Sequence, residues 1–187
     1  KIFKNILEID NKNISALNNL GNVYKSLQDY SSAEDYYKKA IVLNPTFINA
    51  LVNYGSLKYE LNNYEEAVEL YKKALHLNNE IPMAHYNLGL LYQALGRFED
   101  AKFHLQTVSK IKPQITAADK ILSRFIKYKI NDPHINIMES KLNELNLSNL
   151  EKIDLFFSLG KAYEDLKDFD KSFHYLRKGN NLKKQIS

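Results

Sequence analysis

The chain has 187 residues, of which 44% are hydrophobic and 26% are charged, as in an ordinary soluble protein. No apolar run approaches the ~18 residues that a membrane-spanning helix needs, so a membrane protein is not expected. Cysteine is absent, which excludes disulfides and thiolate chemistry, and a formal net charge of +4 does not by itself indicate a nucleic-acid or membrane partner.

The first stretch, 1–13, resembles the second half of a helix pair, because Phe3 and Ile6 stand where such a helix carries apolar residues. We therefore expect the chain to be a piece of a longer protein that starts within a repeat. The apolar edge of this truncated repeat is a candidate surface for self-association, since repeat arrays normally need polar caps. The lack of cysteine and of a signal-peptide pattern favours a cytoplasmic location.

From Ile14 onward the sequence repeats with a period of 34 residues, over 14–47, 48–81 and 82–115. Each repeat contains two amphipathic helices joined by a short polar turn. A glycine recurs in the middle of each first helix, where it costs ~1 kcal/mol relative to alanine, so it predicts a close approach of the two helices. These glycines are Gly21, Gly55 and Gly89.

The repeat resembles the tetratricopeptide repeat. The signature residues of that family match in the first unit at Leu17, Leu20, Gly21, Tyr24, Ala33, Tyr37, Ala40 and Pro45. In the second unit Lys58 replaces the expected aromatic residue, and in the third His85 takes a large-apolar position. The resemblance implies an all-α fold, a right-handed α-solenoid of helix-turn-helix repeats that binds proteins or peptides in its concave groove.

The remainder of the chain is less regular. Residues 116–152 read as a degenerate repeat or helical linker, in which Asp132 caps a helix that starts at Pro133. Residues 153–187 restore the spacing of the earlier units and form a further repeat of the same type. We expect all of these parts to belong to one superhelical domain.

An asparagine stands two residues before each repeated glycine, although asparagine is unfavourable inside a helix. These asparagines lie off the apolar stripe, toward the groove, where an amide can both donate to and accept from the backbone of an extended peptide. A similar asparagine ladder lines the tetratricopeptide groove of O-GlcNAc transferases, and the resemblance concerns these positions only. The alternative is a solvated groove residue without a ligand. The three residues are Asn19, Asn53 and Asn87.

The same register places further residues on the groove side of the first helices. They are Asn22, Lys25, Ser56, Tyr59, Met83, Tyr86, Leu90 and Gln93. Val52, Met83, Tyr86 and Leu90 predict an apolar patch for a peptide anchor, and the alternative is that some of them only pack against neighbouring helices. The carboxylate clamp that binds chaperone tails needs Lys and Arg where this chain has Asn18, Met83 and Asn87, which argues against that ligand.

Residues 121–184 resemble the segment that precedes the catalytic domain in bacterial tetratricopeptide–sulfotransferase proteins. The stretches "KYKINDPH", "LGKAYEDL" and "RKGN" carry the resemblance. It implies a non-catalytic, acceptor-recruiting region of a sulfotransferase whose catalytic domain is absent from this chain. The alternative is that "LGKAYEDL" is only repeat consensus.

Catalytic motifs are absent from the sequence: there is no phosphate-binding loop and no nucleophile elbow, and the histidines lack metal-ligand spacing. We therefore expect no enzyme activity, cofactor or metal in this chain. A basic cluster of Arg124, Lys127 and Lys129 stands beside Phe125 and Tyr128, but the aromatic residues occupy packing positions. The expected partner is a protein or an extended peptide, and neither nucleic acid nor membrane is expected.

Overall fold

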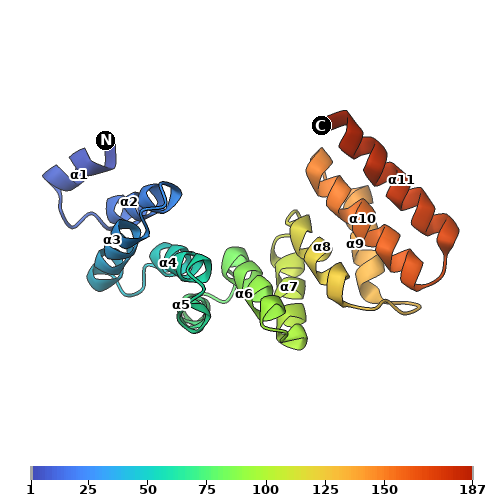
Figure 1. Cartoon of the computed structure of the whole chain (residues 1–187), viewed down its shortest axis with the longest axis horizontal. Helices are drawn as coiled ribbons and strands as arrows, with labels where there is room; N and C mark the ends of the chain where they lie inside the picture. Colours follow the sequence, from blue (N-terminus) through green and yellow to red (C-terminus); the bar gives the residue numbers. More distant parts are fainter. Residues whose placement is uncertain (1, 187) are drawn as a thin grey trace. The chain divides into compact units, whose positions relative to one another are not determined.

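The structure is a computed structural model of the chain, and it describes residues 2–186. Over these residues it consists of α-helices and contains no β-strand (Figure 1), which confirms the all-α prediction. The helices are α1 (Ile2–Ile9), α2 (Ile14–Ser26), α3 (Tyr30–Leu43), α4 (Ile48–Glu60), α5 (Tyr64–Leu77), α6 (Pro82–Ala94), α7 (Phe98–Ile111), α8 (Thr116–Phe125), α9 (Pro133–Glu144), α10 (Asn149–Asp165) and α11 (Phe169–Ile186). None of them is long and apolar enough to cross a membrane.

The helices gather into two compact units, unit 1 over residues 1–91 and unit 2 over residues 92–187. Helix α6 contributes residues to both units. The expectation that all repeats form one superhelical domain stays a prediction.

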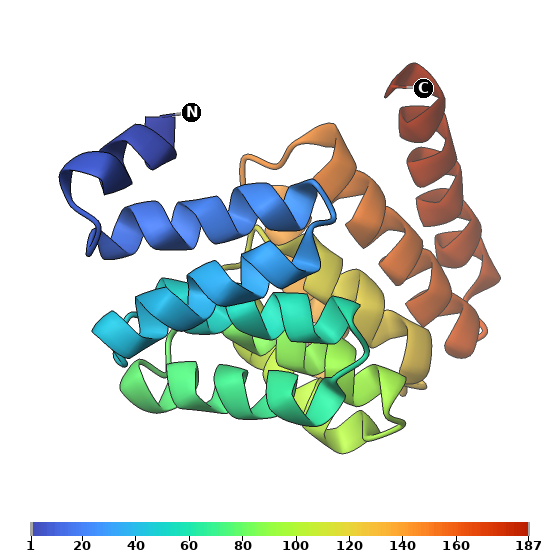
Figure 2. The ribbon, with the colours of Figure 1, turned by 60° about the vertical axis from the view of Figure 1, so that its left-hand side comes forward.

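In unit 1 the pairs α2–α3 and α4–α5 are helical hairpins, and α4 packs on α3 (Figure 2). Glycine allows the helices of each pair to approach closely, as the sequence predicts. A Cβ atom added at Gly21 would lie 2.5 Å from Cε1 of Tyr37, and one at Gly55 would lie 2.7 Å from Cε1 of Tyr71. The glycines therefore make room for a buried tyrosine from the second helix of each pair.

The turn inside each complete helix pair is short and has the same geometry in both units. One residue adopts a left-handed backbone conformation, with φ between 60° and 71°. After α2, the N–H of Gln28 donates to the carbonyl of Lys25, and the N–H of Asp29 donates to that of Tyr24, which is a Schellman motif. Asp29 then caps α3 by accepting a hydrogen bond from the N–H of Ser32. The left-handed residues are Gln28, Asn62, Gly96 and Lys167.

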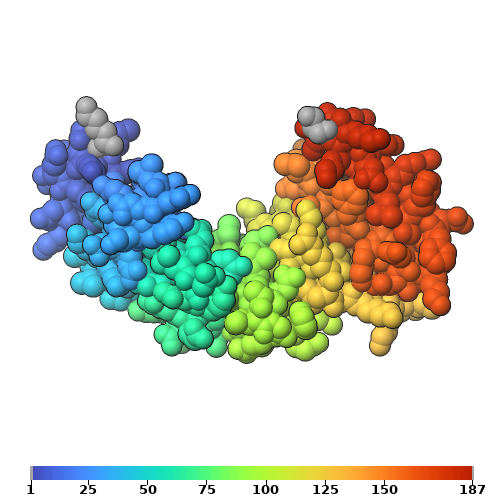
Figure 3. Space-filling view, in the orientation of Figure 1, coloured from blue at the N-terminus to red at the C-terminus, as the bar shows by residue number. Residues whose placement is uncertain are grey.

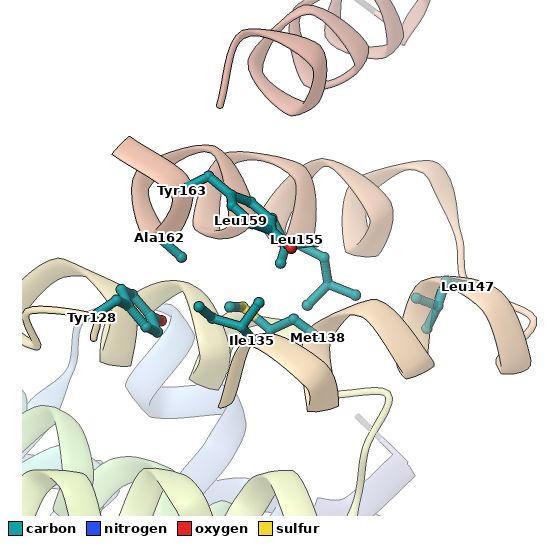
Figure 4. Packing of buried hydrophobic residues seen from close by; sticks show 8 residues of the cluster. All are labelled: Tyr128, Ile135, Met138, Leu147, Leu155, Leu159, Ala162 and Tyr163. Carbon is teal, nitrogen blue, oxygen red and sulfur yellow. The ribbon is translucent and has the colours of Figure 1, made fainter. Parts of the chain in front are cut away.

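In unit 2, helix α10 packs against α8, α9 and α11. Its contact with α9 is apolar: Ile135 and Met138 on α9 face Leu155 and Leu159 on α10 (Figure 4). The predicted start of α9 is confirmed, because Asp132 accepts from the N–H of His134 and proline stands at the first helical position.

Helix α10 begins at Asn149, four residues before the expected start of the last repeat at residue 153. The earlier start follows from a capping box. The Ser148 side chain accepts from the N–H of Glu151, and the Glu151 carboxylate accepts from the N–H of Ser148.

Candidate functional site: the ladder face of unit 1

The predicted asparagines occupy equivalent places on three first helices of the repeats, with Asn19 on α2, Asn53 on α4 and Asn87 on α6. All three side chains are half-buried. We call the surface that these residues share with their neighbours on α2, α4 and the unit 1 part of α6 the ladder face. A half-buried amide is accessible to a ligand and still held by its surroundings.

One rung of the ladder is already bonded to the preceding repeat. The Asn53 side chain donates from Nδ2 to Oδ1 of Asn18 on α2 over 3.0 Å. Asn18 is only 5% exposed, so this bond satisfies a buried amide oxygen. It uses one of the two N–H groups of Asn53 and fixes the direction in which the amide points.

Two buried tyrosines reach the ladder face from the second helices. The hydroxyl of Tyr37 donates to Oδ1 of Asn22 over 2.6 Å. Burial and the negative charge of Glu60 raise the pKa of Tyr37 to about 12, so the hydroxyl stays protonated and remains a donor. Burial also raises the pKa of Tyr71, while its hydrogen bonds with Asn87 and Ser56 act in the opposite direction.

Lysine 25 links the first and second repeats on the same face. Lys25 donates from Nζ to Oγ of Ser56 over 2.9 Å and forms an ion pair with Glu60 at 2.6 Å. The predicted site residues Lys25 and Ser56 are thus brought together, and Lys25 belongs to the joint between α2 and α4. The sequence did not predict this pairing, because the partners are 31 residues apart on different helices.

The apolar candidates differ in how much surface they offer. Met83 is 52% exposed, whereas Val52 is 7% exposed and therefore contributes little to an apolar patch. Tyr86 and Leu90 are half-buried. Tyr59 is half-buried and packs its ring against that of Tyr64, with 5.8 Å between centroids.

Of the predicted residues, Gln93 lies in the part of α6 that belongs to unit 2, so it is not placed on the ladder face of unit 1.

Lys58, which replaces the expected aromatic residue, is buried in unit 1 and balanced by two carboxylates. Its ammonium group lies 2.9 Å from Oε1 of Glu34 and 3.0 Å from Oε2 of Glu66. Tyr54 donates to the same Glu34 oxygen over 2.8 Å. This network joins α3, α4 and α5, and its charges are satisfied internally.

Unit 2 contains a buried polar cluster that the sequence did not predict. Asp119 on α8 is fully buried and accepts from Lys141 over 2.6 Å, while its other oxygen lies 3.0 Å from Nε2 of His134. Lys141 also donates to Ser109 over 2.7 Å, and the hydroxyl of Tyr128 lies 2.8 Å from Nδ1 of His134. We name these five residues the Asp119 cluster.

The chemistry of the Asp119 cluster is that of a structural joint. Lys141 donates its hydrogen bond to Ser109, so it is not placed to remove a proton from that hydroxyl and activate it. The bonds join α7, α8 and α9, which gives each polar group a partner. Among residues 2–186, no group of three or more His, Cys, Asp or Glu side chains is placed to hold a metal ion.

Five matches to family models cover most of the chain. Models described as tetratricopeptide repeat match residues 14–47, 36–69, 82–115 and 153–186, and a model described as TPR repeat matches residues 55–96. No curated protein matches the sequence.

Solved structures with a similar fold include three at low sequence identity. YrrB, a TPR protein with an unusual peptide-binding site, is 19% identical, with a TM-score of 0.70 over 97% of this chain and 92% of its own. PilF of Pseudomonas aeruginosa is 22% identical, with a TM-score of 0.70 over 92% of this chain and 78% of its own. MamA is 22% identical, with a TM-score of 0.57 over 98% of this chain and 86% of its own. At these identities the likeness shows the fold.

Proposed function

Because this chain is built from tetratricopeptide repeats, we propose that it is a scaffold that binds an extended segment of a partner protein on the ladder face of unit 1. The observation that carries the proposal is the row of half-buried amides at Asn19, Asn53 and Asn87. An amide row recognises main-chain N–H and C=O groups and is therefore insensitive to the ligand's side chains.

The neighbours of the row support this function by holding it in place. The Asn18 bond orients Asn53, and the Tyr71 hydroxyl hydrogen bonds with Asn87. An amide that is already oriented loses less conformational freedom when a ligand binds, which increases affinity. Met83 supplies exposed apolar surface beside the row, and it favours a ligand with an apolar side chain near that point.

Binding to selected peptides tests the proposal with the full chain. Peptides are selected from a random library against the wild type, and their Kd is measured for a variant with Asn19, Asn53 and Asn87 all changed to Ala. Each lost hydrogen bond is worth about 0.5–1.5 kcal/mol, so we expect affinity to fall on the order of 10- to 100-fold. The matched control changes the exposed asparagines Asn136, Asn143 and Asn181 to Ala and should bind like the wild type.

Circular dichroism of both triple variants establishes that the helices remain folded. Equal affinity of the wild type and the ladder variant for every selected peptide would place the binding surface elsewhere and refute the proposal.

A second proposal is that the chain recruits an acceptor protein for a sulfotransferase domain. It is motivated by the resemblance of residues 121–184, and two of the stretches that carry it contact each other in unit 2. Lys161 of "LGKAYEDL" donates to the carbonyl of Ile126, next to "KYKINDPH", over 2.6 Å. Asp165 accepts from the N–H of Tyr128 over 3.0 Å. Reading the gene beyond Ser187 tests it: a phosphosulfate-binding loop supports the proposal, and a stop codon rejects it.

A further inference from the structure

Helix α11 presents a face that is covered in the equivalent helix of unit 1. The repeat matches 14–47 and 153–186 share one register, so α11 corresponds to α3 residue by residue. Phe169 and Phe173 of α11 take the places of Tyr30 and Glu34.

In unit 1 that face of α3 is covered by helix α4. Tyr54 and Lys58 of α4 donate to Glu34 over 2.8 Å and 2.9 Å. The rings of Tyr54 and Tyr37 lie 6.1 Å apart, and Tyr37 is fully buried. The structure therefore contains its own example of what packs on this face, which is an amphipathic helix.

On α11 the same face is exposed and more apolar. Phe169 and Phe173 are 66% and 65% exposed and lie one turn apart. In the space-filling view α11, in red, forms a surface of unit 2 (Figure 3). Exposed phenylalanines at this spacing are the anchors that a partner helix requires.

The charge of α11 indicates the chemistry of that helix. It has five basic residues and one acidic residue, Asp170. In α3, Lys38 pairs with Glu34 at 2.6 Å, one turn away. In α11 the corresponding pair is Arg177 and Phe173, with the guanidinium 5.9 Å from the ring centroid. Phe173 cannot supply the carboxylate that Glu34 supplies, so a helix that covers this face gains by bringing its own.

We propose that the Phe169–Phe173 face of α11 is a docking surface for an acidic amphipathic helix of a partner protein. The apolar stripe of the partner helix covers the two phenylalanines, and its carboxylates meet Arg177 and the neighbouring Lys178. This surface belongs to unit 2 and is separate from the ladder face.

A synthetic helix derived from α4 is the probe for this surface. The peptide has the sequence of residues 48–61 with Lys58→Glu, acetylated and amidated, and a second peptide keeps Lys58. Fluorescence anisotropy at low ionic strength measures their binding to the full chain. We expect the Lys58→Glu peptide to bind at least fivefold tighter than the Lys58 peptide, with the difference reduced in 0.5 M salt, since salt screens exposed charges.

Two variants of the chain locate the binding. Phe173→Glu should weaken binding of the Lys58→Glu peptide at least tenfold, whereas Ile130→Glu, at an equally exposed hydrophobic residue of the same unit, should not change it. Arg177→Glu should reverse the preference between the two peptides, which a general loss of folding does not produce.

Several results overturn the proposal. Equal binding by wild type and Phe173→Glu, or an unchanged preference in Arg177→Glu, places the peptide elsewhere. Binding to phosphatidylserine vesicles that Phe173→Glu abolishes, without peptide binding, assigns the face to a membrane surface. Dimerisation in sedimentation that Phe173→Glu abolishes assigns it to a second copy of the chain.

Discussion

The Asn53 side chain on α4 donates a 3.0 Å hydrogen bond to Asn18 on α2, so two repeats are joined on the face proposed to hold the ligand. One amide therefore has both a structural and a binding role. The two roles predict different effects for neighbouring asparagines, and these effects can be measured separately.

Asn53→Ala should lower the free energy of unfolding by about 1 kcal/mol, because it leaves the buried oxygen of Asn18 without this donor. Asn19→Ala should change it by less than about 0.5 kcal/mol, as for most surface substitutions. Urea unfolding followed by circular dichroism measures both. If Asn18→Ala and Asn53→Ala have strictly additive effects in a double-mutant cycle, the bond contributes nothing to stability.

The carboxyl group of Glu34 should make the stability of the chain depend on pH. Burial alone would raise its pKa, but hydrogen bonds from Lys38, Lys58 and Tyr54 lower it from 4.5 to about 2. A lowered folded-state pKa stabilises the protein above pH 4.5, and this contribution is lost as the pH falls toward 2. In urea unfolding from pH 7 to pH 3, Glu34→Gln should therefore lose less stability than the wild type. Parallel curves for the two proteins would contradict this role.

Lys167→Gly should stabilise the chain by about 0.5–1 kcal/mol, because Lys167 adopts a left-handed conformation at φ 60° that is strained for a residue with a Cβ atom. Gly96 occupies the equivalent turn without this strain. Thermal unfolding should show a higher Tm for the variant. The control is Lys171→Gly inside α11, which should lower the Tm because glycine destabilises a helix interior.

Lys141→Met should cost about 3–5 kcal/mol, because it leaves the fully buried Asp119 without its ammonium partner. The double variant Asp119→Asn with Lys141→Met should recover part of this loss, since the uncompensated charge is then also removed. Chemical unfolding of the three proteins measures the difference. A double variant less stable than Lys141→Met alone would show that Asp119 is held mainly by its other partners, such as His134.

The sequence was sufficient for the features that repeat. The period of 34 residues predicted the helix pairs and the close contacts at Gly21 and Gly55, because each depends on one residue type returning at one place. The capped start of α9 was predicted from Asp132 and Pro133 alone, since capping is local.

The features that do not repeat could not be predicted in the same way. Ser109, Asp119 and Lys141 stand on three helices with irregular spacing, and only the fold brings them together. Lys58 was recognised as a departure from the pattern, but its partners Glu34 and Glu66 became evident only when α3, α4 and α5 were packed. The roles of the ladder residues in binding and the sulfotransferase link stay predictions.

The left-handed turns also explain why the period of this chain is 34 residues and does not drift. A single residue such as Gln28 ends one helix, and the next residue already caps the following helix, so no residue is spare. An inserted residue that extends either helix would rotate the remainder of that helix by about 100°. Ala33 would then point away from the interface, so each repeat can change its residue types far more easily than its length.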